Sequence, residues 1–391
     1  MRIGISTYHS CLNDGAILQA YCLASALKER IQGAEVEIVD YRHPSERQVY
    51  GPPDDRRKKA LSEFVDKVLP LSRERFEDED PRKAHEFISK NYDMLVVGSD
   101  EVWRLEYRRR FGGLWVERGS PWTAPFPNIF WPDGDVGIRK ASYGASVGGT
   151  DWRLIPRGDK RIMREILEGF SVIGVRDSRT RSFLRWLDPA LEERAEWVPD
   201  PTFALDWLSN VDRDSVKRKM ENCGVDFGKP RLGVVLSDST WLERIVERFR
   251  QKGFQIVGLA VPNHFSDVEL FGEDFTPPEW GAAFGFLDAC LTRRMHPSIA
   301  CILSGTPFAV VDFYGNALDE KSKLSDLMQT FGLLDYYYCA SKKSGSFERL
   351  LQTCLRVIEA PWPKERVEGV TKDLQKKARD FIDALGSGLG R

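Results

Sequence analysis

The sequence lacks the features of several large classes of protein. It has no run approaching the roughly 18 to 20 apolar residues that a membrane-spanning helix requires, and no basic N-terminal region followed by an apolar core. Its 57 Lys and Arg nearly balance its 59 Asp and Glu, for a formal net charge of −2, so no global charge attracts it to nucleic acid or an anionic membrane. We therefore expect a soluble, cytoplasmic protein whose anion-binding sites, if it has any, are local.

Cysteine and histidine are both scarce. The seven cysteines are odd in number, scattered and never in a C-x-x-C arrangement, which disfavours a disulfide framework and a structural zinc site. No histidine–carboxylate cluster has metal-ligand spacing, so we predict reduced, buried cysteines and no metal. Two common motifs are also missing: G-x-G-x-x-G and G-x-x-x-x-G-K-[ST]. The fingerprints of dinucleotide sites and phosphate loops are therefore absent.

The chain has enough apolar residues and enough length for two folded domains. Of its 391 residues, 42% are hydrophobic, and short apolar runs alternate with helix-like segments, as in α/β proteins with parallel sheets. The pattern predicts two Rossmann-like domains that face each other across a cleft. We place the first at 1–205, with a loop insertion at about 104–137, and the second at 206–360. A C-terminal helix lies in 361–391 and could pack back on the first domain.

Ligands of open α/β sheets bind beyond the carboxyl ends of the strands, so residues that follow a predicted strand are the candidates. In the first such turn, Asn13 or Asp14 could cap a helix whose start approaches a ligand, although ordinary capping explains them equally well. In the second, Asp100 and Trp103 could bind a sugar through carboxylate hydrogen bonds and ring stacking. A plain strand-to-helix turn is the alternative there.

Two further strands carry polar residues. Lys140 and Ser142 lie in the segment 140–146, where they could face the cleft, but close backbone packing would also explain its small side chains. Arg176 ends the next strand, and a guanidinium matches the geometry of carboxylate and phosphate groups. Arg176 could equally form a structural ion pair with Asp177.

The most distinctive turn of the second domain contains Arg293, Arg294 and His296. We predict that Pro297 begins a helix and that His296 caps it, which would place Arg294 beside unpaired backbone N–H groups. This combination is typical of an anion site with a titratable neighbour. A structural cap with solvated arginines is the alternative.

Two groups of residues could extend the binding surface. Tyr314, Lys321 and Lys323 follow a later strand and could form a basic wall, or the lysines could simply be solvated at a helix start. The aromatic segment 115–131 could contact a sugar acceptor, or it could be a hydrophobic plug beneath a long loop.

Taken in order, these segments resemble the polysaccharide pyruvyl transferase family over about residues 1–335. The resemblance rests on NDGAILQA at 13–20, VGSDEVW at 97–103, KASYGAS at 140–146, PDPT at 199–202, TRRMH at 292–296 and GTPF at 305–308. It implies two Rossmann-like domains of the glycosyltransferase-B type. It also implies transfer of a pyruvyl group from phosphoenolpyruvate to a pair of sugar hydroxyls as a ketal, in the synthesis of a surface polysaccharide or glycoconjugate.

The chemistry of that reaction suggests roles for the candidates. Phosphoenolpyruvate has a carboxylate and a phosphate, which Arg176 and Arg294 could bind, and His296 could assist phosphate departure or relay the proton. Asp100 or Asp14 could orient or deprotonate a saccharide or lipid-linked saccharide acceptor, and no cofactor is needed. A sugar-nucleotide glycosyltransferase of the same architecture and a noncatalytic glycan-binding protein remain the alternatives.

Overall fold

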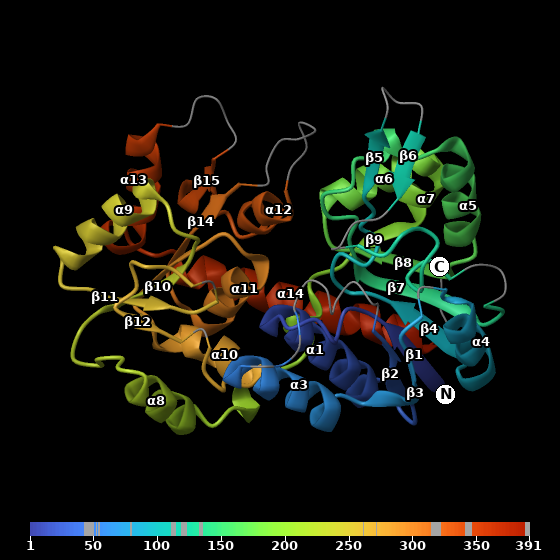
Figure 1. Ribbon diagram of the computed structural model, residues 1–391, viewed down its shortest axis with the longest axis horizontal. Coiled ribbons are helices and arrows are strands. Elements are labelled where there is room, and N and C mark those ends of the chain that lie inside the picture. Colours follow the sequence, from blue (N-terminus) through green and yellow to red (C-terminus); the bar gives the residue numbers. More distant parts are fainter. Residues whose placement is uncertain are drawn as a thin grey trace. The chain divides into compact units, whose positions relative to one another are not determined.

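The computed structural model divides the chain into two compact units (Figure 1). Unit 1 comprises Met1–Asp54, Ser62–Leu205 and Leu374–Arg391, and unit 2 comprises Asp55–Leu61 and Asp206–Asp373. The residues that the structure describes are 1–42, 51, 53, 55–78, 80–110, 115–118, 123–132, 136–260, 262–270, 272–313, 322–340 and 346–387.

Unit 1 is built on a seven-stranded sheet in which every neighbouring pair of strands is parallel. Its central strand β4 reads Met-Leu-Val-Val and is buried throughout, because helices cover both faces of such a sheet. In spatial order the strands are β3 (Leu71–Phe76), β2 (Glu35–Tyr41), β1 (Arg2–Ser6), β4 (Met94–Val97), β7 (Arg139–Ala145), β8 (Val172–Val175) and β9 (Ala195–Trp197).

The two faces of this sheet have separate cores. On one face, Tyr143 of β7 contacts Phe381 of the C-terminal helix, with ring centroids 5.5 Å apart. On the other face, a large cluster includes apolar residues of α4, α5 and α6. The helices are α1 (Asp14–Arg30), α3 (Arg56–Val68), α4 (Arg82–Asn91), α5 (Arg157–Glu168), α6 (Ser178–Leu187), α7 (Pro189–Arg194) and α14 (Lys364–Ser387), with 3-10 turns at η2 (Trp152–Leu154) and η3 (Pro201–Phe203); α3 and α14 each contribute to both units.

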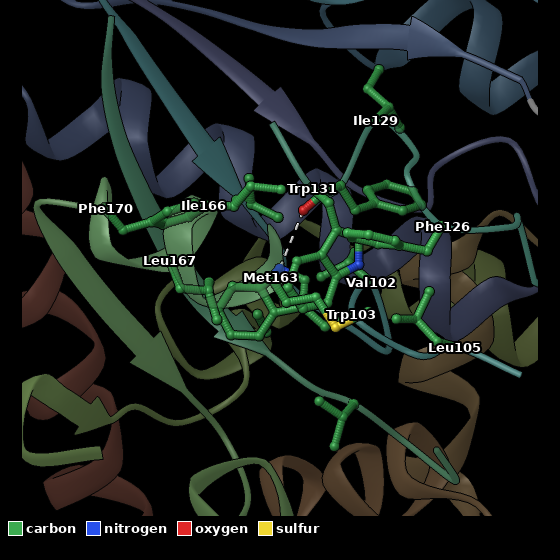
Figure 2. Close-up of a cluster of buried hydrophobic side chains, with 14 of the residues drawn as sticks. Val102, Trp103, Leu105, Phe126, Ile129, Trp131, Met163, Ile166, Leu167 and Phe170 are labelled. Atoms are coloured by element: carbon green, nitrogen blue, oxygen red, sulfur yellow. Dashed lines mark hydrogen bonds between the residues drawn. The ribbon is translucent and has the colours of Figure 1, made fainter. Parts of the chain in front are cut away.

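The segment predicted as a loop insertion at 104–137 contains two short strands and several buried aromatic residues. Strands β5 (Tyr107–Arg110) and β6 (Trp115–Arg118) pair antiparallel, and the aromatic residues that follow them lie in the core. Trp131 is 0% exposed and packs on Trp103 and Phe126, each with ring centroids 5.6 Å away (Figure 2). Of the two alternatives for this segment, the structure therefore favours the hydrophobic plug for its described aromatic residues. Trp122 lies outside the described residues.

Unit 2 has a six-stranded sheet, also parallel between every neighbouring pair. Its order is β12 (Val268–Glu269), β11 (Gln255–Gly258), β10 (Arg231–Val235), β13 (Ala289–Thr292), β14 (Phe308–Asp312) and β15 (Tyr337–Cys339). Helices α9 and α13 pack together, as do α8, α10 and α11 (Figure 1). These helices are α8 (Arg213–Asn222), α9 (Thr240–Arg250), α10 (Pro277–Ala283), α11 (Met295–Ser304), α12 (Lys323–Thr330) and α13 (Phe347–Glu359), with 3-10 turns at η4 (Trp207–Asn210), η5 (Phe284–Phe286) and η6 (Leu334–Tyr336).

The strand orders of the two sheets determine where ligands are expected. In each sheet the order reverses beside the first strand of the unit, between β1 and β4 in unit 1 and between β10 and β13 in unit 2. In doubly wound folds the ligand crevice lies at this reversal, beyond the carboxyl ends of the strands. The turns after these four strands are therefore the positions at which to look for a site.

Two further observations bear on the predictions from composition. All seven cysteines are free, and five of them are buried, in agreement with their predicted reduced state. Within the described part of the chain, no helix is both long enough and apolar enough to cross a bilayer.

Candidate functional site

In unit 1, a buried arginine joins two carboxylates at the carboxyl edge of the sheet. Arg176 follows β8, and its Nη2 donates to Oδ1 of Asp100 at 2.6 Å while its Nη1 donates to Oδ2 of Asp200 at 2.8 Å. The side chains of Arg176 and Asp200 are 1% and 0% exposed, whereas that of Asp100 is 16% exposed. Burial alone lowers the pKa of Arg176, but the two carboxylates outweigh burial and raise it. Asp100 is therefore the member of the trio that reaches solvent.

The backbone of Asp100 depends on the glycine before it. Asp100 has a left-handed φ of 75°, and Gly98, two residues earlier, has a φ of 119°. A Cβ at position 98 would lie 2.3 Å from the carbonyl oxygen of Tyr143. The turn after β4 can therefore approach β7 only with glycine at this position, and the approach places Asp100 within reach of Arg176.

This geometry changes the ion pair predicted for Arg176. The predicted partner Asp177 caps α6 instead, accepting from the backbone N–H of Thr180 at 2.7 Å. The Arg176 guanidinium is enclosed with Asp100 and Asp200 and holds the Asp100 carboxylate in place, and its contact with a substrate stays a prediction.

On the β1 side of the strand-order reversal, the turn that follows β1 caps helix α1. Oδ1 of Asn13 accepts from the backbone N–H groups of Gly15 and Ala16 at 3.1 and 3.3 Å. Asp14 is the first residue of α1 and is buried. Ordinary capping, one of the two alternatives for this turn, thus accounts for Asn13.

Three residues of unit 1 that were predicted to contact substrate are buried. Lys140 is buried and lies second from the amino end of β7, which is the wrong end of the strand for a ligand contact. The hydroxyl of Ser142 bridges β7 to β8, donating to the carbonyl of Gly174 and accepting from its N–H. Trp103 is 0% exposed and donates from Nε1 to the carbonyl of Phe130, so its ring has no face available to a sugar (Figure 2).

In unit 2, the turn after β13 leads into the ten-residue helix α11, but its cap differs from the prediction. The N-cap residue is Arg294, and Met295 begins the helix, so His296 and Pro297 are its second and third residues rather than its cap and first. An arginine has no acceptor atom, and no side chain caps this helix start. The positive end of α11 therefore adjoins a cationic residue, whereas a capping side chain would have contributed an acceptor.

The three predicted residues of this turn differ in exposure. Arg294 is exposed, and its backbone N–H donates to Oγ1 of Thr292 at 3.0 Å. Arg293 and His296 are half-buried. Nη1 of Arg293 donates to Oγ of Ser237 at 3.3 Å, and its guanidinium carbon lies 5.2 Å from the ring centroid of Phe313. The structure thus brings Arg293 and Arg294 to the strand-order reversal of unit 2.

Sequence reasoning missed Arg57, which belongs to the same unit. Its neighbour Arg56 pairs with Glu273 at 2.9 Å and Asp274 at 3.0 Å, which anchors the start of α3 in unit 2. Arg57 is buried, and burial together with the positive charge of Arg294 lowers its pKa to about 10. In the sequence it belongs to the run Arg-Arg-Lys-Lys, which is indistinguishable from a solvated helix face. Only the fold places it near Arg294.

The remaining predicted residues follow β14. Lys323 is the first residue of α12, whose cap is Ser322. Asp312, at the end of β14, accepts hydrogen bonds from the hydroxyls of Ser322 and Tyr337. Tyr314 and Lys321 lie outside the described residues. Within the part of the chain that the structure describes, no group of three or more His, Cys, Asp or Glu side chains could hold a metal ion.

Solved structures of sugar-nucleotide enzymes share this fold. The UDP-GlcNAc 2-epimerase of Methanocaldococcus jannaschii aligns with a TM-score of 0.58 at 12% identity, covering 99% of this chain and 100% of that one. A putative UDP-N-acetylglucosamine 2-epimerase of Listeria monocytogenes gives 0.57 at 11% identity, with 99% and 96% covered. UGT73P12 of Glycyrrhiza uralensis gives 0.53 at 9% identity, again with 99% and 96% covered. The fold is therefore glycosyltransferase-B-like, as predicted.

Sequence comparison identifies the family. No curated protein matches the chain. The family model described as polysaccharide pyruvyl transferase matches residues 13–313, which is well over half of the chain and runs from the cap of α1 to the turn after β14. The chain therefore belongs to the polysaccharide pyruvyl transferase family.

Proposed function

We propose that the protein transfers the pyruvyl group of phosphoenolpyruvate to two hydroxyls of a saccharide or lipid-linked saccharide, forming a ketal and releasing phosphate. The observation that carries the proposal is the turn after β13, where Arg294 stands at the uncapped start of α11. This turn lies at the strand-order reversal of unit 2, where the fold binds ligands. Family membership gives the pyruvyl group as the one transferred.

The donor needs at least two positive groups, because it has both a phosphate and a carboxylate. Arg294 supplies one, and the backbone N–H groups of the first turn of α11 supply partial positive charge beside it. Arg57 adds a second guanidinium to the same region, since its pKa responds to the charge of Arg294. An anion bound near both guanidinium groups offsets their mutual repulsion, which lowers the free energy of the bound state.

The reaction requires the movement of protons at four atoms. A proton adds to the methylene carbon of the donor, which makes the neighbouring carbon cation-like, and the first sugar hydroxyl attacks that carbon and loses its proton. The bond from carbon to phosphate oxygen then breaks, and that oxygen takes up a proton as hydrogen phosphate leaves. The second hydroxyl closes the ring and loses its proton. In the proposal His296, in the first turn of α11, assists phosphate departure or relays the proton.

Asp100 is the best-placed carboxylate of unit 1 to orient or deprotonate the acceptor. Its side chain is partly exposed, while Arg176 holds one of its oxygens at 2.6 Å. Asp14, the other candidate, is buried at the start of α1. The reaction balances with donor and acceptor alone, so the proposal includes neither cofactor nor metal. That the protein acts in the cytoplasm stays a prediction.

The test is an assay with phosphoenolpyruvate and a panel of saccharide acceptors, measuring phosphate release and acid-labile pyruvate on the acceptor. We expect Arg294→Ala to lower kcat/KM by roughly 10²- to 10³-fold, as loss of one preorganised donor to developing negative charge does elsewhere. The matched control is Arg248→Ala, because Arg248 is also an exposed arginine of unit 2, on α9, with one long contact to Gln251 at 3.5 Å.

Arg248→Ala should keep wild-type activity. Full activity in Arg294→Ala would contradict the proposed donor site. Turnover of a nucleotide sugar, with no response to phosphoenolpyruvate, would instead support the glycosyltransferase alternative.

A further inference from the structure

Three neighbouring strands of unit 2 end in a small group of aromatic and cationic side chains. Trp241 follows β10, Arg293 follows β13 and Phe313 follows β14, and these strands are adjacent in the sheet. The rings of Trp241 and Phe313 have centroids 5.7 Å apart and an interplanar angle of 37°. The guanidinium carbon of Arg293 lies 5.2 Å from the Phe313 centroid. All three side chains therefore meet at the carboxyl edge.

Each of the three is fixed by its own element. Ser239 caps α9 by accepting from the N–H of Leu242 at 3.2 Å, which fixes the helical turn that carries Trp241. The N–H of Arg293 donates to the carbonyl of Val235, and its guanidinium to Ser237. Asp312, directly before Phe313, accepts from the hydroxyl of Tyr337 at 2.7 Å. The sheet and the segments that follow its strands therefore fix the positions of the two rings.

The exposure of Phe313 distinguishes this group from the rest of the molecule. Its side chain is 39% exposed, and every other Phe, Tyr and Trp whose burial the structure describes is buried or half-buried. An apolar ring exposed to water loses the free energy that burial would give it. Single exposed apolar residues are common, but this one is oriented by a second ring and a cation at the edge where the fold binds ligands.

A pyranose ring fits such a surface. One face of the ring presents C–H groups that can pack on aromatic rings, while its hydroxyls need hydrogen-bond donors at the edge. A guanidinium has five N–H donors, so Arg293 can bond to Ser237 and also donate to a sugar hydroxyl. Arg293 is also the residue next to Arg294, which places the ring-binding surface beside the proposed donor site.

We propose that Trp241, Phe313 and Arg293 form a subsite for the pyranose ring of the acceptor saccharide. This inference rests on the proposed function, because phosphoenolpyruvate has no ring and the ring of the reaction therefore belongs to the acceptor. It assigns ring binding to unit 2, whereas the aromatic contact with a sugar acceptor suggested by the sequence was the segment 115–131 of the first domain.

The test measures sugar binding without any donor. Saturation-transfer NMR would be recorded with methyl pyranosides of glucose, galactose, mannose and N-acetylglucosamine as probes. For at least one of them we expect saturable binding that Phe313→Ala and Trp241→Ala each weaken by roughly tenfold, whereas Phe313→Tyr keeps it because the ring remains. Thermal unfolding of each variant checks that the unit is folded.

A matched control exists at the amino ends of the strands of the same sheet. Phe227, just before β10, pairs with Phe286 at 5.9 Å, and the guanidinium of Arg231 lies 4.9 Å from the Phe227 ring. Phe227→Ala removes an equivalent aromatic and cation contact at the amino ends of the strands. It should leave sugar binding unchanged.

Three results would overturn the subsite: no binding of any probe, unchanged binding in the two alanine variants, or an equal loss in Phe227→Ala. Uridine diphosphate is included as a further probe. If Phe313→Ala weakens its binding while the methyl pyranosides do not depend on Phe313, the surface recognises a nucleotide and the inference is wrong. Because no donor is present, failure of phosphoenolpyruvate as a substrate would leave a positive sugar result standing.

Discussion

At the scale of single residues, one imidazole and two guanidinium groups surround a buried carboxylate of unit 1. Asp40, near the end of β2, is 4% exposed and meets Nε2 of His9 at 3.1 Å, Nε of Arg42 at 2.7 Å and Nε of Arg75 at 2.9 Å. Nδ1 of His9 faces the carbonyl of Thr7, which can only accept. Both ring nitrogens of His9 therefore face acceptors, and the nitrogen that carries the proton donates to one of them.

We predict that Asp40→Asn destabilises unit 1 by about 2 kcal/mol at pH 7, because it removes the buried charged acceptor that His9, Arg42 and Arg75 share. Burial alone raises the pKa of Asp40, but hydrogen bonds from His9, Arg42 and Arg75 outweigh it and lower the pKa. A lowered folded-state pKa gives stability that is present above the unfolded value of about 4 and is lost as the pH falls below it. Urea unfolding at pH 7 and pH 3 should show the difference between variant and wild type shrinking at the lower pH.

Asp66→Asn is the control for this prediction. Asp66 also pairs with Arg42, at 2.7 Å, but its side chain is 46% exposed, so we expect a change of about 1 kcal/mol or less. A difference between Asp40→Asn and wild type that grows toward pH 3 would show that the sign of the argument is wrong.

At the scale of elements, periodicity predicted the strands and helices far better than it predicted which side chains reach a ligand. The apolar runs at 35–41 and 94–97 predict two strands, and these are the observed bounds of β2 and β4. Gly305 follows a predicted helix as a stop signal, and it ends α11 in the left-handed conformation. By contrast, Lys140 and Trp103 were selected by residue type. The burial of Lys140 depends on which end of β7 it occupies, and the burial of Trp103 depends on rings contributed from 126–131. Neither cause can be inferred from the local sequence pattern.

Two other elements escaped prediction for the same reason. Strand β3 reads Leu-Ser-Arg-Glu-Arg-Phe and is one of the two edge strands of the unit 1 sheet. Its exposed charges conceal it within 44–81, where the density of charge and proline predicts a peripheral insertion. The turn into α11 was predicted with Pro297 at the first helical position, which is the commonest place for proline. The structure instead begins the helix at Met295.

Helix α14 packs on unit 1 against a strand that tolerates no side chain at one position. A Cβ at Gly174 of β8 would lie 2.6 Å from Cζ of Phe381 and 2.7 Å from the carbonyl oxygen of Ser142. We predict that Gly174→Ala lowers the stability of unit 1 by about 1–3 kcal/mol, because a ring and a backbone atom must both move. Thermal unfolding measures this loss.

Gly158→Ala is the matched change in a helix. Nothing lies within 4 Å of a Cβ at Gly158 in α5, and alanine is the better helix former, so stability should stay the same or rise by up to about 1 kcal/mol. If the two variants unfolded at the same temperature, the close packing of α14 on β8 would be refuted.

At the scale of the whole molecule, the order of the chain does not follow the two units. The last residues return to unit 1, where Phe381, Ile382 and Leu385 of α14 are 6%, 0% and 0% exposed, and Arg30 of α1 pairs with Asp383. Burying three such apolar side chains contributes on the order of 5 kcal/mol, which is comparable to the net stability of a whole domain. Unit 1 should therefore depend on residues that follow all of unit 2 in the sequence.

We predict that ending the chain after Asp373 destabilises unit 1 and leaves unit 2 folded. Hydrogen exchange should accelerate in the amides of β7 and β8, which the end of α14 covers through Tyr143 and Gly174, and should remain slow in β10 and β13. A chain ending after Ser387 keeps all of α14 and should exchange like the full chain. Equal acceleration in both sheets, or in neither, would mean that the end of α14 does not belong to unit 1 alone.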